Sequence, residues 1–381
     1  MRRGRFPSQK KRNEPRIFFR LWHAVPRALI DARFVARALS AMSAFDGLFS
    51  LVESAIGQPA AHWLREHVEV PQGLLDFSWH PQALHRAWLA EALNLCLLHK
   101  LVDAVPDGRR YVQEQAQQGR KVVFDHGAIR TVDWPVNGEL PRGRLAFSRL
   151  LEPLGFTDVR TYPLTQLNMT GWGYRHMDLP EDIAQFFVSE LHPGRFSEGF
   201  QQAVSRVVSS SRDPLNAEHK AILHRLQLTR HCSLRDAQQV LHGLYHAFDR
   251  QHGAVQEADY QCLLQESAEM AWIATEGNSF NHLTDRVSDL HATVAQQRDL
   301  QRPMKDSIEV SASGRVMQTA YRACTVTRGL VDEHGVYREH QVPGSFVEFI
   351  QRETDPATQR LDLNFDSSNA QGIFKMTASN A

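Results

Sequence analysis

The sequence lacks three features that would assign it to a specialised class of protein. It has no apolar run of 18 residues, so we expect neither a membrane span nor the core of a signal peptide. None of its four cysteines stands in a C-x-x-C pair, so we expect small buried thiols in a reducing compartment rather than zinc or redox ligands. Lys plus Arg and Asp plus Glu number 43 each, which gives no indication of a nucleic-acid partner. We therefore expect a cytoplasmic protein that binds neither nucleic acid nor membrane.

The first 20 residues depart from this charge balance, since they hold eight Lys or Arg and a single Glu. This pattern predicts that residues 1–30 form a disordered, solvated leader. Two alternatives stay open: an organelle-targeting leader, because the segment is rich in Arg and poor in acid, and a basic tail that touches phosphate or a membrane surface.

The overall composition is that of a globular chain, with 42% hydrophobic and 23% charged residues among 381. A chain of this length forms one large domain or two ordinary ones. It can bury a substantial core without disulfides or structural metals. A metal site in this protein would therefore be free to serve a function.

Hydrophobic periodicity divides the chain into a mostly helical region at 31–118 and a sheet domain at 119–381 with a helical insertion at about 198–265. The spacing predicts helices over 31–57, 81–104, 144–155 and 198–253. It predicts strands over 121–131, 174–178, 185–192, 307–313, 315–322 and 346–352, and a short helix after Asp366. The expected fold class is α+β, a curved antiparallel sheet preceded by helices.

The strand at 121–131 brings a histidine and an arginine to one face. Side chains alternate along a strand, so Phe124, His126, Ala128 and Arg130 share a side. The backbones of His126 and Arg130 are then about 13 Å apart, four steps of roughly 3.3 Å. Their long side chains can close that gap around a small anion. The alternative is that this face of the strand meets solvent.

Two further polar residues lie in apolar surroundings. His282 follows a small polar approach that resembles a loop entering a strand, although a lone histidine is more often a structural residue than a ligand. Glu348 shares a face with Phe346 and Ile350, opposite Val347 and Phe349, so it is a carboxylate inside a buried strand. Such a group needs a cation, a hydrogen-bond donor or a metal. Two imidazoles and one carboxylate form the facial triad of non-haem Fe(II) oxygenases, but periodicity alone does not select these among 19 histidines.

The choice of His126, His282 and Glu348 comes from a resemblance to a known family, which is carried by several runs in order along the chain. They are DHGAIR at 125–130, MTG at 169–171, QFFVSELH at 185–192, GNSFNH at 277–282, PMKDSIEVS at 303–311, GSFVEF at 344–349 and FDSSNA at 365–370. With these runs the chain resembles the 2-oxoadipate dioxygenase/decarboxylase family. That family's fold is similar to the vicinal-oxygen-chelate sheet of hydroxymandelate synthase, which forms a metal cavity.

The resemblance implies a function and a set of site residues. It implies that Fe(II) is bound by His126, His282 and Glu348, and that Arg130 binds the substrate. The implied reaction converts 2-oxoadipate and O₂ to 2-hydroxyglutarate and CO₂ in lysine breakdown. Gln318 and Asn369 are weaker candidates for lining the substrate site. The first 110 residues match the family poorly and the chain is short after Glu348, so the exact 2-oxo acid stays open.

Three other functions remain alternatives. One is a metal-dependent isomerase or lyase of the same superfamily, which would use Zn or Mn and for which Glu190 and His192 are possible ligands. Another is a zinc-binding helical module, since His242 and His246 lie on one helical turn but lack the Glu of a metalloprotease motif. The last is a non-catalytic ligand-binding relative, which the intact triad disfavours.

Overall fold

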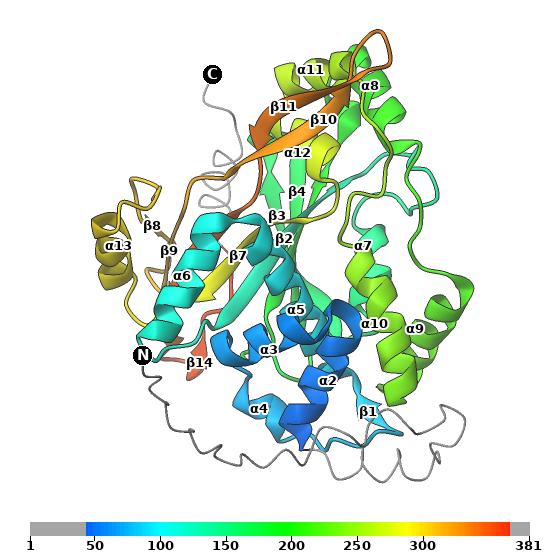
Figure 1. Cartoon of the computed structure of the whole chain (residues 1–381). Helices are drawn as coiled ribbons and strands as arrows, with labels where there is room; N and C mark the ends of the chain where they lie inside the picture. Colours follow the sequence, from blue (N-terminus) through cyan, green and yellow to red (C-terminus); the bar gives the residue numbers. More distant parts are fainter. Residues whose placement is uncertain (1–42, 366–381) are drawn as a thin grey trace, which may run out of the picture. The chain divides into compact units, whose positions relative to one another are not determined.

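The computed structural model describes residues 43–365, and its central feature is a strongly curled sheet of eight strands (Figure 1). The strand order is β3-β4-β5-β2-β7-β12-β9-β8. These strands are β2 (Phe124–Val132), β3 (Phe156–Leu164), β4 (Met169–His176), β5 (Gln185–Leu191), β7 (Phe280–Arg286), β8 (Glu309–Val310), β9 (Val316–Ala320) and β12 (Phe346–Arg352). The predicted leader at 1–30 and the predicted helix after Asp366 lie outside the described residues.

The α+β class is confirmed, but the sheet is mixed rather than antiparallel. Strand β2 pairs with β5 in parallel, and β12 pairs with β7 in parallel, while the other neighbours are antiparallel. A parallel pair needs a long crossover, and each of these two pairs encloses several other elements in the chain. Alternation along one strand carries no information about the direction of its partner, which is why the sequence did not predict it.

The helices before β2 are α2 (Ala44–Ile56), α3 (Gln58–His67), α4 (Gln72–Leu75), α5 (Arg86–Ala104) and α6 (Pro106–Gln117). Two of them, α5 and α6, pack on the convex face of the sheet, and α2 and α3 pack against them. Helix α5 is buried along most of its length because it packs against α2, α10 and β7. In α6, Tyr111 meets Phe349 of β12 with ring centroids 4.8 Å apart. Helix α5 begins later than predicted, because Leu84 and His85 instead form the short strand β1.

Five helices lie between β5 and β7: α8 (Glu198–Val208), α9 (Ala217–Thr229), α10 (Leu234–His246), α11 (Glu257–Glu266) and α12 (Ala268–Glu276). Apolar residues of α8, α11 and α12 form one core with the strand residues Ala128, Tyr162 and Phe187. Figure 1 shows these three helices gathered near the hairpin of β10 (Thr325–Val331) and β11 (Tyr337–Pro343). One end of the concave face is therefore filled by helices.

The remaining elements are short: α7 (Leu145–Leu151), α13 (Leu290–Asp299), β6 (His231–Cys232), β13 (Thr354–Asp355), β14 (Arg360–Leu361) and two 3₁₀ turns, η1 (Thr165–Leu167) and η2 (Pro193–Arg195). The predicted strands at 121–131, 185–192 and 346–352 are confirmed as β2, β5 and β12. Strand β3 and the β10–β11 hairpin were not predicted.

The four cysteines are free thiols, and Cys96 is buried while the other three are half-buried. Among residues 43–365, no helix combines the length and apolar character that crossing a bilayer requires.

Candidate metal centre

The register of three neighbouring strands brings the predicted ligands together. His126 of β2 pairs with Thr284 of β7, and Thr284 pairs with Glu348 of β12, so these three residues form one row across the sheet. His282 lies in the adjacent row, opposite Ala128. Residues directly opposite each other share a face of the sheet, and alternate residues of one strand do so too. All four polar side chains therefore point to the concave face.

The three ligand side chains meet at metal-binding distances. The Nε2 atoms of His126 and His282 each lie 3.3 Å from Oε2 of Glu348, and the three ligand atoms are all within 4.8 Å of one another. Ligands bound at about 2.1 Å to one metal stand about 3.0 Å apart at octahedral angles and about 3.4 Å apart at tetrahedral ones. The triad is deeply buried, with exposures of 3% for His126, 5% for His282 and 0% for Glu348. These residues could hold a metal.

Charge at the triad also suits a cation. Burial alone would raise the pKa of Glu348, but the contacts with His126, His282 and Thr284 hold it below its usual range, so the group is a carboxylate. Burial lowers the pKa of His282 to about 3, which keeps that imidazole neutral. Burial also disfavours a charge on His126, yet its hydrogen bonds to Asp125 and Glu348 raise its pKa. A proton and a metal therefore compete for Nε2 of His126.

One buried atom of the triad tests the fit to a metal independently. Oε1 of Glu348 is buried and accepts no hydrogen bond from any of the described residues. A buried carboxylate oxygen without a partner is costly, and a bound cation would satisfy it. Imidazole and carboxylate donors suit first-row divalent metals, Fe(II) among them. The residues present thus fit the metal that the resemblance implies.

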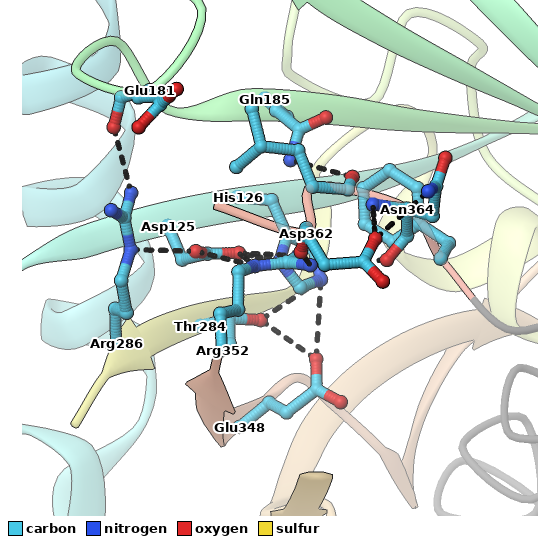
Figure 2. A network of polar contacts seen from close by, with 12 residues as sticks. Asp125, His126, Glu181, Gln185, Thr284, Arg286, Glu348, Arg352, Asp362 and Asn364 are labelled. Atoms are coloured by element: carbon cyan, nitrogen blue, oxygen red, sulfur yellow. Dashed lines mark hydrogen bonds and ion pairs between the residues drawn. The ribbon is translucent and has the colours of Figure 1, made fainter. Parts of the chain in front are cut away.

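A second layer of polar groups orients His126 (Figure 2). Nδ1 of His126 lies 2.8 Å from Oδ1 of Asp125, which is fully buried and binds Arg286 and Arg352. These partners hold the pKa of Asp125 well below its usual range against the effect of burial. An ionised Asp125 accepts a hydrogen bond from Nδ1–H of His126, which keeps the proton on Nδ1 and leaves Nε2 with a free lone pair on the side of Glu348.

Strand alternation alone would place Asp125 on the convex face, away from His126. The pairing of β2 with β7 shifts register between Phe124 and His126, as at a β-bulge. A bulge changes the direction of a side chain, and here it accompanies the contact between neighbouring residues. The sequence analysis missed this role of Asp125, because nothing local marks the irregularity.

Arg130 lies on the concave face, as the alternation predicted, and the solvent-facing alternative is wrong. Every residue of β2 is buried, and Arg130 is only 1% exposed. Its guanidinium carbon stands 4.8 Å from the ring centre of Trp272 in α12. Burial lowers its pKa to about 10, and the nearby Glu269 opposes that effect. The charge of Arg130 in turn contributes to the low pKa of His282, so the cation acts on the metal triad.

Gln318 and Asn369, the weaker candidates for lining the substrate site, have different outcomes. Gln318 is buried on β9, opposite Ile350, and its Nε2 lies 3.5 Å from a carboxylate oxygen of Glu309. Alternation places it on the face of Glu348, two residues along β9 from Ala320. Asn369 lies outside the described residues.

Two buried polar residues of the site were missed. Thr284 donates a hydrogen bond to Oε2 of Glu348 at 2.7 Å. Gln185 of β5 is paired with His126 and donates to the carbonyl of Leu363 at 3.3 Å, while its Oε1 has no hydrogen-bond partner among residues 43–365. Only the register across strands reveals either residue, and no sequence signal carries that register.

The alternative ligands Glu190 and His192 form a second cluster with Asp133, also within 4.8 Å. The side chain of Arg142 binds Asp133, and the backbone N–H of Arg144 donates to Glu190. Nearby guanidinium groups disfavour a bound cation. His242 and His246 contact each other, but they belong to no cluster of three ligating side chains in the described part of the chain.

The fold and the site define the class: an α+β protein of the glyoxalase type, with a buried two-histidine, one-carboxylate centre that could hold a metal. The family model described as 2-oxoadipate dioxygenase/decarboxylase matches residues 94–371. The chain belongs to this family.

Solved structures share the fold of this chain. A protein of Ralstonia eutropha assigned to the glyoxalase superfamily is 48% identical, with a TM-score of 0.80, covering 84% of this chain and 98% of its own. The hydroxyglutarate synthase of Oryza sativa, solved with 2-oxoadipate, is 15% identical with a TM-score of 0.61, covering 80% of this chain and 97% of its own. The hydroxyglutarate synthase of Pseudomonas putida, also solved with 2-oxoadipate, is 15% identical with a TM-score of 0.56, covering 79% of this chain and 75% of its own. At this identity the last two likenesses concern the fold. No match was found among curated protein sequences.

Proposed function

We propose that this protein is an Fe(II)-dependent dioxygenase and decarboxylase that converts 2-oxoadipate and O₂ to 2-hydroxyglutarate and CO₂. The observation that carries the proposal is the buried triad of His126, His282 and Glu348 with Arg130 on the same concave face, in a member of this family. The reaction balances without a further co-substrate. One atom of O₂ would enter the new carboxylate of 2-hydroxyglutarate and the other its hydroxyl group, while CO₂ would carry away the carboxylate next to the keto group.

When bound, Fe(II) would chelate the 2-oxo acid and activate O₂ at the positions that a facial triad leaves open. The protein's own residues do the rest. Asp125 holds the proton on Nδ1 of His126, so Nε2 is free to act as a ligand. Thr284 fixes Glu348 through its hydroxyl group. Burial of the triad excludes bulk water, which strengthens every electrostatic contact among these side chains.

Arg130 would bind a carboxylate of the substrate. A guanidinium presents a planar fork that matches a carboxylate at two points, and a lysine does not reproduce it. The indole of Trp272 packs against the guanidinium and limits its freedom. Gln318 and Asn369 are proposed as further residues lining the substrate site, in a catalytic domain of residues 119–381.

Oxygen uptake tests the proposal. The purified protein, supplied with Fe(II), should consume O₂ with 2-oxoadipate and release CO₂ in equal amount, and a panel of 2-oxo acids of different lengths should identify the preferred substrate. His126→Ala should lose both bound metal and turnover. Turnover without O₂ would instead indicate a metal-dependent isomerase or lyase. Absence of bound metal in the active protein would contradict both.

A further inference from the structure

Residues 362–365, called here the strap, cross the concave face beside the metal triad. The carbonyl of Leu363 accepts the hydrogen bond from Gln185. The ring of Phe365 meets the imidazole of His126 with centroids 4.9 Å apart, and its backbone N–H donates to the hydroxyl of Tyr162 at 3.1 Å. The strap is thus in direct contact with one of the proposed ligands.

One guanidinium holds both the strap and the partner of that ligand (Figure 2). Nη1 of Arg352 donates to the carbonyls of Asp362 and Asn364 at 2.8 and 3.0 Å. Its Nε and Nη2 donate to Asp125 at distances of 2.8 to 3.1 Å. The side chains of Arg352 and Asp125 have no exposure at all, so water cannot replace either set of contacts.

A second arginine provides a natural comparison. Arg286 also donates to Asp125, at 2.9 Å, but its other contact is the carbonyl of Glu181. Its side chain keeps 21% exposure. Arg286 therefore shares the Asp125 contact with Arg352 but none of the contacts to the strap.

We propose that Arg352 is a positioning residue that couples metal binding at His126 to the placement of the strap. It orients His126 through Asp125, which Nε and Nη2 bind, and it fixes two strap carbonyls through Nη1. A change that loosens either set of contacts alters the other, and by linkage a bound metal and an ordered strap stabilise each other. This inference rests on the metal site of the proposed function, but not on the identity of the substrate.

The test combines a Co(II) titration of the metal-free full-length chain, followed by visible absorption, with hydrogen exchange of the strap amides. Arg352→Lys keeps a positive charge for Asp125 but cannot reach Asp125 and two carbonyls together. It should weaken Co(II) binding by about 10- to 100-fold, the range for partners of metal ligands. The strap amides should also exchange faster, and Co(II) should slow their exchange in the wild type.

Arg286→Lys is the matched control. It should leave the strap amides as protected as in the wild type and change Co(II) affinity less than Arg352→Lys does. Equal effects of the two substitutions on both readouts would overturn the inference, since the strap contacts would then add nothing. Unchanged Co(II) affinity in Arg352→Lys would overturn it as well.

A substitution of Gln185 keeps the inference testable if Arg352 variants do not fold. Gln185→Leu removes the donor to Leu363 and leaves every partner of Asp125 in place. It should speed exchange in the strap and weaken Co(II) binding; faster exchange with unchanged affinity would overturn the coupling. Failure of the wild type to bind Co(II) would overturn the proposed function itself, whereas normal wild-type binding with unaltered variants would overturn this inference alone.

Discussion

Arg130 should determine whether the protein prefers a dicarboxylate, and Arg130→Gln is the substitution that tests this. The paired substrates are 2-oxoadipate and 2-oxohexanoate, which have the same number of carbons and differ in whether the far end carries a carboxylate. Arg130 is buried on β2 beside Trp272, so a substrate carboxylate would meet it away from bulk water. We expect the substitution to reduce kcat/KM for the dicarboxylate far more than for the monocarboxylate.

The pKa of Arg130 gives the size of the effect. A fall from the usual 12.5 to about 10 corresponds to about 3 kcal/mol of lost stabilisation for the buried cation. A bound carboxylate would restore much of this, about 2 to 3 kcal/mol, which is about 30- to 150-fold in kcat/KM. Arg130→Lys keeps the charge without the planar fork, so its loss should be smaller.

The assay is initial-rate oxygen consumption with each substrate, after metal content has been matched between wild type and variant. A ratio of kcat/KM values that falls by about two orders of magnitude places the far carboxylate on Arg130. A similar loss with both substrates would place the carboxylate beside the keto group there instead. Wild-type rates with both substrates would refute a binding role for Arg130.

Three further predictions concern the metal and the stability of the fold. Thr284→Val should weaken Co(II) binding by about 10- to 100-fold because Glu348 loses its hydroxyl donor, while Thr284→Ser should not; a titration of both variants checks this. The Co(II) affinity of the wild type should fall by about tenfold per pH unit below the raised pKa of His126, because a proton then occupies Nε2. A Co(II) affinity that stays constant from pH 8 to pH 5 would contradict this. Burial, reinforced by Asp182, raises the pKa of Glu91 to about 8 from 4.5, so the stability of the wild type should fall as pH rises between these values. Glu91→Gln should increase the free energy of unfolding in urea by about 3 kcal/mol at pH 7. Identical dependence of stability on pH in the wild type and Glu91→Gln would disprove the assignment.

The sequence predicted the strands of the site better than the way in which they pair. Alternation correctly placed His126 and Arg130 on one face and identified Glu348 as a buried carboxylate, because these properties depend on one strand at a time. It did not predict that Thr284 lies between His126 and Glu348, because that row depends on pairings between strands far apart in the chain. The resemblance to a family selected the three candidate ligands, and the structure shows these side chains meeting.

The loop predicted before the strand of His282 is confirmed, because residues 277–279 form a turn between α12, which ends at Glu276, and β7, which begins at Phe280. The predictions failed where a local pattern was overridden by its surroundings. The contact between Asp125 and His126 depends on an irregular pairing that alternation cannot indicate.

The candidate metal centre depends on β7, which has an antiparallel neighbour on one side and a parallel neighbour on the other. A slip of one residue in either pairing would turn a ligand to the opposite face of the sheet. Two contacts at the start of β7 oppose such a slip. Ser345 donates from its hydroxyl to the carbonyl of Phe280 at 2.8 Å, which ties β12 to β7. The ring of Phe280 fills the space where a Cβ on Gly127 would stand, only 2.4 Å from its nearest atom, so β2 and β7 approach closely only with glycine at this position. The short runs that contain the ligands thus include residues whose contribution is to hold the register, and their proximity in the sequence to His126, His282 and Glu348 follows from that physical requirement.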